Sequence, residues 1–458
     1  MTFILQRWQS SFYLRLLSLA LPITLQTLMF SSKGMIDSMM LGRLGATEIA
    51  AAGIATKILF VVSIFLLGLA MGAGQLAAQA WGARQAGLTG ADELPRQLAQ
   101  GLWLQWLFTL PLVALMVFCP AWLIGLVSPE AALLHEGGAF LQIVGPSLLL
   151  FNYTCTLCSG LRAMQQPGIA TLYSVIGVLV NIVLNAWLIF GGWGIEALGV
   201  KGAALGTALG GVVEASLLYL HLRWRGHLLA RLPLRQWPDW AALRTQLQLS
   251  LQLATNSTLW ALGALVFFAI VGGQNPVTLA ALSILAPIES FSLALLIGLT
   301  CAAAILIGAT VGAGDEALAQ QQGWAALWLG LVLGLLTMLA VGLAWPLLLA
   351  QYPALAKPVV TELEILFQLM LLGFVVKSCA MMLLAGVLRG GGDNGFCLGL
   401  DFSVQWLLII PLAWWLSVAL HWPASWLYAL MLLEELLKIG GAVARMSSGR
   451  WLHRLVAA

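Results

Sequence analysis

Two opposite charges stand close together in a segment that is otherwise apolar. In the stretch SSKGMIDSMMLG, residues 31–42, Lys33 precedes Asp37 by four positions, so on a helix both side chains would lie on one face. A charged carboxylate at the centre of a membrane helix costs about 2.5 to 3.5 kcal/mol on insertion scales. We therefore expect Asp37 to face the interior of a helical bundle or water, where it would serve a function.

A buried carboxyl of this kind can bind and release a proton. Burial and hydrogen bonds from amide groups act on its proton affinity in opposite directions, so its charge can differ between two conformations. Asn181 and Asn185 are four residues apart in a later segment and would share one helix face. Lys33 would compete with the proton for Asp37. In the alternative interpretation, the two charges merely neutralise each other.

Further charged residues fall inside apolar segments. Glu214, Glu289 and Asp401 are acids, for which structural or interfacial roles are the simpler interpretation. Lys377 could pair with Glu289 or Asp401 in the second half of the chain. Pro22 lies upstream of Asp37 in the same segment; because proline frees a backbone carbonyl and permits a bend, it is a candidate hinge.

The elements that must position these residues are membrane helices. The 458 residues are 61% hydrophobic and only 9% charged, with a mean hydropathy of +0.96, which excludes a water-soluble globular protein. A helix needs about 20 apolar residues to cross the hydrocarbon, and twelve segments meet this requirement. The predicted spans are 13–40, 48–80, 97–118, 131–159, 168–190, 199–221, 245–271, 277–310, 323–350, 361–387, 396–419 and 424–445.

The distribution of basic residues predicts the orientation. With the N-terminus inside, the inner segments hold fourteen arginines, whereas the outer loops hold Arg43, Lys201 and Lys357. This positive-inside bias favours two cytoplasmic termini and an even number of crossings. The net charge of +3 therefore reflects topology and not nucleic-acid binding.

The two halves of the chain are related in sequence. The stretch GLAMGAGQLAAQAWGA from Gly68 aligns with GLTCAAAILIGATVGA from Gly298, and SGLRAMQQPG aligns with AGVLRGGGDNG, which pairs Arg162 with Arg389. Six helices are thus duplicated in parallel orientation. We expect an N-terminal six-helix bundle over residues 1–222, a basic interfacial linker over 223–244 and a C-terminal six-helix bundle over 245–458.

The repeat predicts where the site lies. The counterpart of Asp37 is Phe267, and the counterparts of Asn181 and Asn185 are Leu408 and Leu412. The first bundle thus carries polarity that the second lacks. This asymmetry favours a specific site in the N-terminal bundle.

These residues resemble the Multidrug And Toxic compound Extrusion (MATE) transporters over nearly the whole chain. The resemblance rests on LALPITLQTL, DSMMLGRLGATEIAAAGIA, AQAWGAR, NIVLNAWLIFGGWGIEALGVKGAALGT, GATVGAGD and GVLRGGGD. It implies an all-α integral membrane protein with twelve helices in a V-shaped arrangement. It also implies an antiporter that exports organic cations or amphipathic drugs in exchange for protons or sodium and so confers drug resistance.

In that family the first-helix acid, here Asp37, is a coupling residue, joined by Asn181 and Thr207. The family pattern of Asn-x-x-x-Asp in the fifth helix ends in Asn185 here, which puts a two-carboxylate scheme in doubt. The seventh predicted helix lacks the acid that sodium-coupled NorM-type members carry, and the tenth has acids only at its outer entrance. We therefore expect proton coupling of the DinF type, with sodium coupling as the alternative.

Alternating access would then move the cargo across the membrane. We expect drug contacts from Met29, Met35, Asn152 and Tyr153, a bend near Pro22, no cofactor, no metal and a monomer among the lipids of the bacterial inner membrane. A lipid-precursor flippase is disfavoured because intramembrane cations are few. An enzyme is disfavoured because the five histidines lack the spacing of a metal site.

Overall fold

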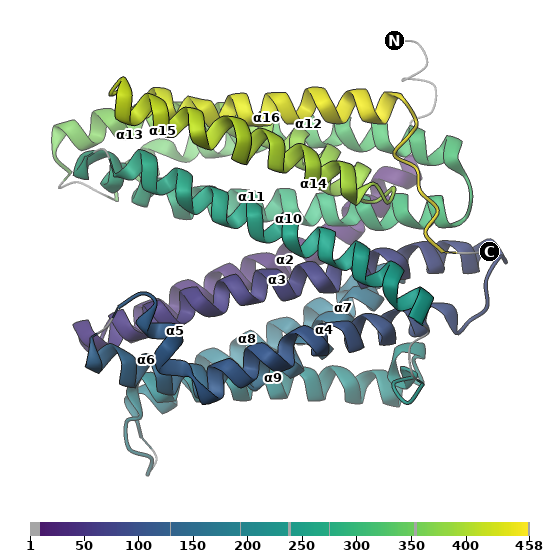
Figure 1. Ribbon diagram of the computed structural model, residues 1–458, viewed down its shortest axis with the longest axis horizontal. Coiled ribbons are helices and arrows are strands. Elements are labelled where there is room, and N and C mark those ends of the chain that lie inside the picture. Colours follow the sequence, from purple (N-terminus) through teal and green to yellow (C-terminus); the bar gives the residue numbers. More distant parts are fainter. Residues whose placement is uncertain are drawn as a thin grey trace. The chain divides into compact units, whose positions relative to one another are not determined.

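The computed structural model describes residues 10–128, 130–192, 194–236, 240–273, 275–351 and 355–456. Helices make up nearly all of this part of the chain (Figure 1). Its contacts divide the chain into two compact units. We call residues 25–258 the N-terminal bundle, and residues 1–24 together with 259–458 the C-terminal bundle.

The helices follow each other with short connections. The first group comprises α2 (Ser10–Leu41), α3 (Ala46–Gln85), α4 (Glu93–Phe118), α5 (Pro120–Gly125), α6 (Ala131–Val144), α7 (Ser147–Ala163), α8 (Pro167–Phe190), α9 (Gly199–Trp224), the 3₁₀ turn η1 (Leu228–Arg231) and α10 (Trp240–Gly272). The second comprises α11 (Pro276–Gly312), α12 (Glu316–Leu349), α13 (Lys357–Met381), the π-helical η2 (Met382–Leu388), α14 (Asn394–Phe402), the π-helical η3 (Ser403–Ile409), α15 (Ile410–Ala419) and α16 (Ala424–Ser447).

Each of the twelve predicted spans coincides with one of these helices or with a continuous pair or triplet. The span predicted at 131–159 is broken into α6 and α7, which are bent by 44°. The break falls at Gly145 and Pro146, where proline removes a backbone donor from the helical ladder. The other predicted boundaries agree to within seven residues, with the largest difference at the start of α12, which begins at Glu316 and not at 323.

Length and composition qualify ten described helices as membrane spans, and eleven when the bent pair counts as one. Helix α16 is long enough, but it holds Glu434, Glu435 and Lys438 in its middle. Such charges are unfavourable in contact with lipid and face a bundle interior instead. The side chains of Glu434 and Lys438 are indeed buried, at 4% and 2% exposure.

The contact units differ from the predicted boundaries at 222 and 245. They divide helix α2 after Thr24 and helix α10 after Thr258. The physical reason lies in the packing, because Leu16 near the start of α2 belongs to the same apolar core as Leu299. Conversely, Ala254 of α10 belongs to a core of the N-terminal bundle. Part of the predicted linker, residues 237–239, lies outside the described residues.

Candidate functional site

Asp37 heads a chain of polar contacts inside the N-terminal bundle. The Asn185 side-chain amide on α8 donates to Asp37 Oδ1 at 2.7 Å. The same amide lies 3.5 Å from Asn181 Oδ1, and the Asn181 amide donates to Thr207 Oγ1 on α9 at 3.3 Å. Both asparagines are buried, at 0% and 1% exposure. The structure therefore brings together four predicted residues from three helices.

Lys33 stands near Asp37 without a close ion pair. Among the described residues, Asp37 has no cationic nitrogen within the 4.0 Å of a salt bridge. The Lys33 ammonium nevertheless interacts electrostatically with Asp37 and, next in strength, with Glu214 of α9. The predicted competitor is thus present at longer range, and it is shared between two acids.

Two glycines of α9 let this helix approach the asparagines of α8. A Cβ atom at Gly206 would fall on the Asn185 amide oxygen, and one at Gly210 would lie 2.9 Å from Asn181 Cβ. Small residues at such positions permit close packing of membrane helices. The two helices run side by side in Figure 1.

A second polar chain in the same bundle was not predicted as a site. Ser174 Oγ donates to Glu214 Oε1 at 2.6 Å, and the Gln26 amide donates to Ser174 Oγ at 2.7 Å. Arg162 of α7 donates in turn to Gln26 Oε1. This chain therefore links four helices and ends at Glu214, for which the sequence suggested only a structural or interfacial role.

The four predicted drug-binding residues lie in different surroundings. Asn152 is fully buried and donates to Thr109 Oγ1 of α4. The Tyr153 ring lies 6.5 Å from the Tyr219 ring. Met29 is half-buried, and Met35 is 49% exposed. The structure does not join any of them to the Asp37 chain by a hydrogen bond.

The C-terminal bundle holds charged pairs at positions that do not align with Asp37, Asn181 and Asn185. Lys377 pairs with Glu289, one of its two predicted partners. Asp401 pairs instead with Lys438 at 3.2 Å and with Arg389 at 3.7 Å. The positions that align with Asp37, Asn181 and Asn185 are apolar. The paired charges of this bundle lie on α11, α13, α14 and α16 and on Arg389.

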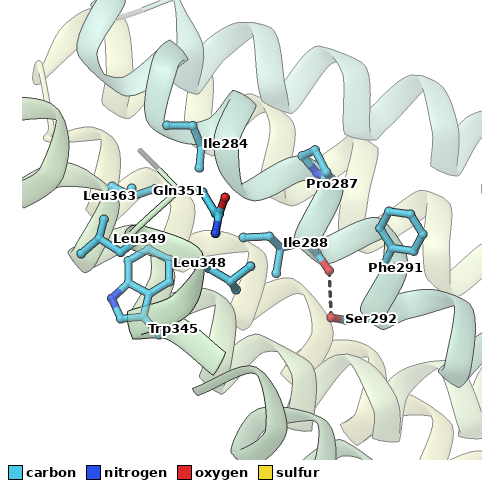
Figure 2. A pocket seen from close by; sticks show the side chains of 10 residues that line it. All are labelled: Ile284, Pro287, Ile288, Phe291, Ser292, Trp345, Leu348, Leu349, Gln351 and Leu363. Carbon is cyan, nitrogen blue, oxygen red and sulfur yellow. Dashed lines mark hydrogen bonds between the residues drawn. The ribbon is translucent and has the colours of Figure 1, made fainter. Parts of the chain in front are cut away.

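An apolar hollow of about 380 Å³ lies in the C-terminal bundle between α11, α12 and the start of α13. Figure 2 shows its lining, in which Trp345, Ile288 and Phe291 contribute large side chains and Ser292 donates to the Ile288 carbonyl at 2.8 Å. None of the ten lining residues is charged. The hollow therefore contains none of the predicted site residues.

Metal ligands do not gather in the part of the chain that the structure describes. No group of three His, Cys, Asp or Glu side chains there is arranged to hold a metal ion. The site consists of carboxylates, amides, hydroxyls and cations inside membrane helices. Such intramembrane ionisable groups are typical of ion and substrate pathways in transporters.

Comparisons with known proteins identify the family. The family model MatE matches residues 22–187 and 253–415. The probable multidrug resistance protein NorM of Mesorhizobium japonicum is 30% identical over 391 residues, which cover 82% of this chain and 81% of that protein. The multidrug resistance protein MdtK of Yersinia enterocolitica is 26% identical over 417 residues, or 86% of each chain. The chain belongs to the MATE family of transporters.

The fold agrees with this assignment. A crystal structure of MATE in complex with MaD3S superposes with a TM-score of 0.83 over 95% of this chain and 96% of that chain, at 16% identity. At this identity the likeness shows the fold alone. Together with the family match, it makes the chain an integral membrane transporter and not an enzyme.

Proposed function

We propose that this transporter is a secondary active antiporter that exports organic cations or amphipathic drugs in exchange for protons. Its coupling residue would be Asp37, and Asn181, Asn185 and Thr207 would position it. Relatives with multidrug resistance in their names support the cargo class. The expected location is the bacterial inner membrane with both termini in the cytoplasm, and the expected state is a monomer.

One observation carries the proposal. Asp37 accepts a hydrogen bond from a neutral amide, Asn185, at 2.7 Å, and no cation within 4.0 Å among the described residues holds its charge fixed. A carboxyl in this setting can exist in both protonation states. A side-chain amide can donate a hydrogen bond to the ionised carboxylate through its N–H, and it can accept one from the protonated carboxyl through its oxygen. This is the property that proton coupling requires.

The cycle would use this change of charge. With the site open inward, a cationic drug is attracted to ionised Asp37, with contacts from Met29, Met35, Asn152 and Tyr153. With the site open outward, protonation of Asp37 removes that attraction and alters its bond to Asn185. The first helix would then bend near Pro22, which lies two residues before the point where the contact units divide α2.

The available driving force is sufficient for this exchange. A proton that moves down a gradient of one pH unit supplies about 1.4 kcal/mol, or about a tenfold concentration ratio. A membrane potential adds about 2.3 kcal/mol per 100 mV for each net charge moved. If the cargo carries one positive charge, exchange for one proton is electroneutral and the pH gradient alone drives it.

The test is dye export in proteoliposomes under an imposed pH gradient and, separately, an imposed sodium gradient. With one pH unit we expect an accumulation ratio of about ten for the wild type and about one for Asp37→Asn. Asp92→Asn, a matched substitution at an exposed acid, should behave like the wild type. Equal export by Asp37→Asn would exclude Asp37 from coupling.

The same vesicles distinguish the alternatives. Export driven by the sodium gradient alone would establish sodium coupling in place of proton coupling. Translocation of a fluorescent lipid-linked phosphate without dye export would establish a flippase. Two cations in the N-terminal bundle, Lys33 and Arg162, already interact with other groups. Lys33 interacts with Asp37 and Glu214, and Arg162 donates to the Gln26 amide oxygen, which disfavours a phosphate cargo.

A further inference from the structure

We propose that Glu214 is a second proton-binding carboxyl of this transporter, placed on the cytoplasmic side of Asp37 and linked to it through the shared cation Lys33. The inference rests on the proposed proton coupling and extends it. It assigns a role to the polar chain around Glu214, which the coupling scheme built on Asp37 does not use.

The first argument is a repeated spacing on two helices. Gln26, Lys33 and Asp37 are separated by seven and then four residues on α2. Ser174, Asn181 and Asn185 have the same spacing on α8. Both series follow one helix face. Their ends are joined by hydrogen bonds, Gln26 to Ser174 and Asn185 to Asp37, so a polar ladder extends for about 16 Å at 1.5 Å per residue.

Helix α9 contributes a third row of polar residues beside those of α2 and α8. Thr207, Glu214 and His221 follow one another at intervals of seven residues, which is close to two full turns. Thr207 accepts from Asn181, Glu214 accepts from Ser174, and His221 Nδ1 lies 2.9 Å from Tyr173 Oη. The ladder thus continues beyond Glu214 to an imidazole near the end of α9, on the side that the basic residues predict to be cytoplasmic.

The helices leave room for this particular acid. A Cβ atom at Gly177 of α8 would lie 2.8 Å from Glu214 Cβ and 2.9 Å from Glu214 Oε2. A larger residue at position 177 would push the carboxylate away from Ser174. Gly177 therefore has the same relation to Glu214 that Gly206 has to Asn185, which indicates a constructed site and not an incidental acid.

The charges around Glu214 explain how the two carboxyls would be coupled. Among the described residues, the ionisable groups that interact electrostatically with it are Lys33 on α2 and Cys155 and Cys158 on α7. The Arg162 guanidinium is bonded to Gln26, which links it to Glu214 through Ser174. Lys33 is therefore the cation among these electrostatic partners, and it acts on both Asp37 and Glu214.

The resulting step balances in charge. When Asp37 carries a proton, the Lys33 ammonium turns to ionised Glu214. When the proton leaves the Asp37 carboxyl and a carboxylate oxygen of Glu214 takes one up, the ammonium moves back towards Asp37. A cationic drug that binds at Asp37 displaces Lys33 to Glu214, which then releases its proton to the cytoplasm. The proton released on drug binding therefore comes from Glu214.

The experiment measures proton release when a cation binds. Purified protein in weakly buffered detergent solution is titrated with tetraphenylphosphonium, while a pH dye reports protons and dialysis reports the bound cation. By proton linkage we expect about one proton per bound cation in the wild type and almost none in Glu214→Gln, with both values counted per cation bound at saturation. Glu196→Gln, at an exposed acid of the same bundle, is the matched control and should release like the wild type.

The outcomes separate the two proposals. Full proton release from Glu214→Gln would overturn the role of Glu214 and leave proton coupling through Asp37 intact. No proton release from the wild type would overturn proton coupling itself. Glu214→Asp should restore release, because it keeps the carboxyl.

Two further variants guard against a purely structural effect. If Glu214→Gln does not elute as folded protein, Ser174→Ala decides, because it removes a hydrogen bond to Glu214 and keeps the acid. It must shift the midpoint pH of proton release, and an unchanged midpoint would overturn the proposal.

Discussion

The two bundles hold their buried charges in different ways. In the C-terminal bundle, Lys438 lies 2.6 Å from Glu434 and 3.2 Å from Asp401, and Lys377 is bonded to Glu289. In the N-terminal bundle, Asp37 is bonded to a neutral amide, and Lys33 acts on it from a longer distance. One bundle thus pairs its charges in contact, whereas the other separates them with amides and hydroxyls.

This difference indicates which ionisable groups can change their protonation state during a transport cycle. A close ion pair away from water keeps both partners ionised, because removing either charge leaves the other uncompensated. A carboxyl held by amides and hydroxyls has no such constraint and can exchange its proton. We therefore infer that the C-terminal charges hold their helices together and that the N-terminal acids carry out coupling.

The largest effect is expected from removing the central cation of the C-terminal bundle. Lys438→Met would leave Glu434 and Asp401 without their closest partner. Breaking a buried pair in this way costs about 3 to 5 kcal/mol, so we expect a large loss of folded protein in a thermal unfolding assay followed by size-exclusion chromatography. Adding Glu434→Gln should restore part of the stability, since it removes one uncompensated charge.

The matched substitution in the N-terminal bundle is Lys33→Met. Because Lys33 makes no ion pair within 4.0 Å among the described residues, its loss should cost about 1 kcal/mol or less, as for loosely paired charges. Export should persist with a changed pH profile. Equal destabilisation by Lys33→Met and Lys438→Met would contradict the distinction between the two bundles.

The sequence predicted the spans well because an apolar run of about 20 residues has few alternatives to a membrane helix. It also placed Asp37, Asn181 and Asn185 correctly on their helix faces, since four-residue spacing defines a face. It could not show that α2 meets α8, because no single-helix pattern records which helices are neighbours. The spacing of seven and four, shared by the segments that start at Gln26 and Ser174, was the available signal for the Glu214 chain.

The sequence predicted the pair of Lys377 with Glu289, but it did not predict the pairing of Lys438 with Glu434 and Asp401. The repeat compares each position with its counterpart, and it pairs Asp37 with Phe267. That comparison says nothing about acids that only the second copy has gained, such as Glu434 on α16. Their pairing with Lys438 depends on tertiary contacts, and only the structure reveals it.

An intermediate effect is expected from adding a methyl group beside the hydrogen bond between Asn185 and Asp37. At Gly206→Ala, the new methyl group would collide with the Asn185 side chain that holds Asp37. Overpacking of this kind costs about 1 to 3 kcal/mol, so we expect export to fall by about tenfold. Gly211→Ala is the control, because a Cβ atom there meets nothing within 4 Å, and its export should not change. Normal export by Gly206→Ala would show that the bond from Asn185 to Asp37 is dispensable.

The smallest effect concerns His227, a titratable group outside the membrane helices. Its Nδ1 accepts from the Leu229 amide at 3.3 Å, which requires the neutral ring. Burial and the nearby His221 lower the pKa of His227 below its usual value. The unfolded chain, with a pKa of about 6.5, therefore binds the proton first as the pH falls.

The sign of this effect follows from proton linkage. Where the unfolded state binds more protons, the free energy of unfolding decreases as the pH falls, so the stabilising contribution of neutral His227 is present above about pH 6.5 and is lost below it. His227→Asn should remove this part of the pH dependence, measured as the difference in melting temperature between pH 7.5 and 5.5. Its export should keep the wild-type pH profile, because His227 lies outside the membrane helices and the proposed coupling acids, Asp37 and Glu214, lie within them. A shifted export profile in His227→Asn would instead place part of the coupling at the connection after α9.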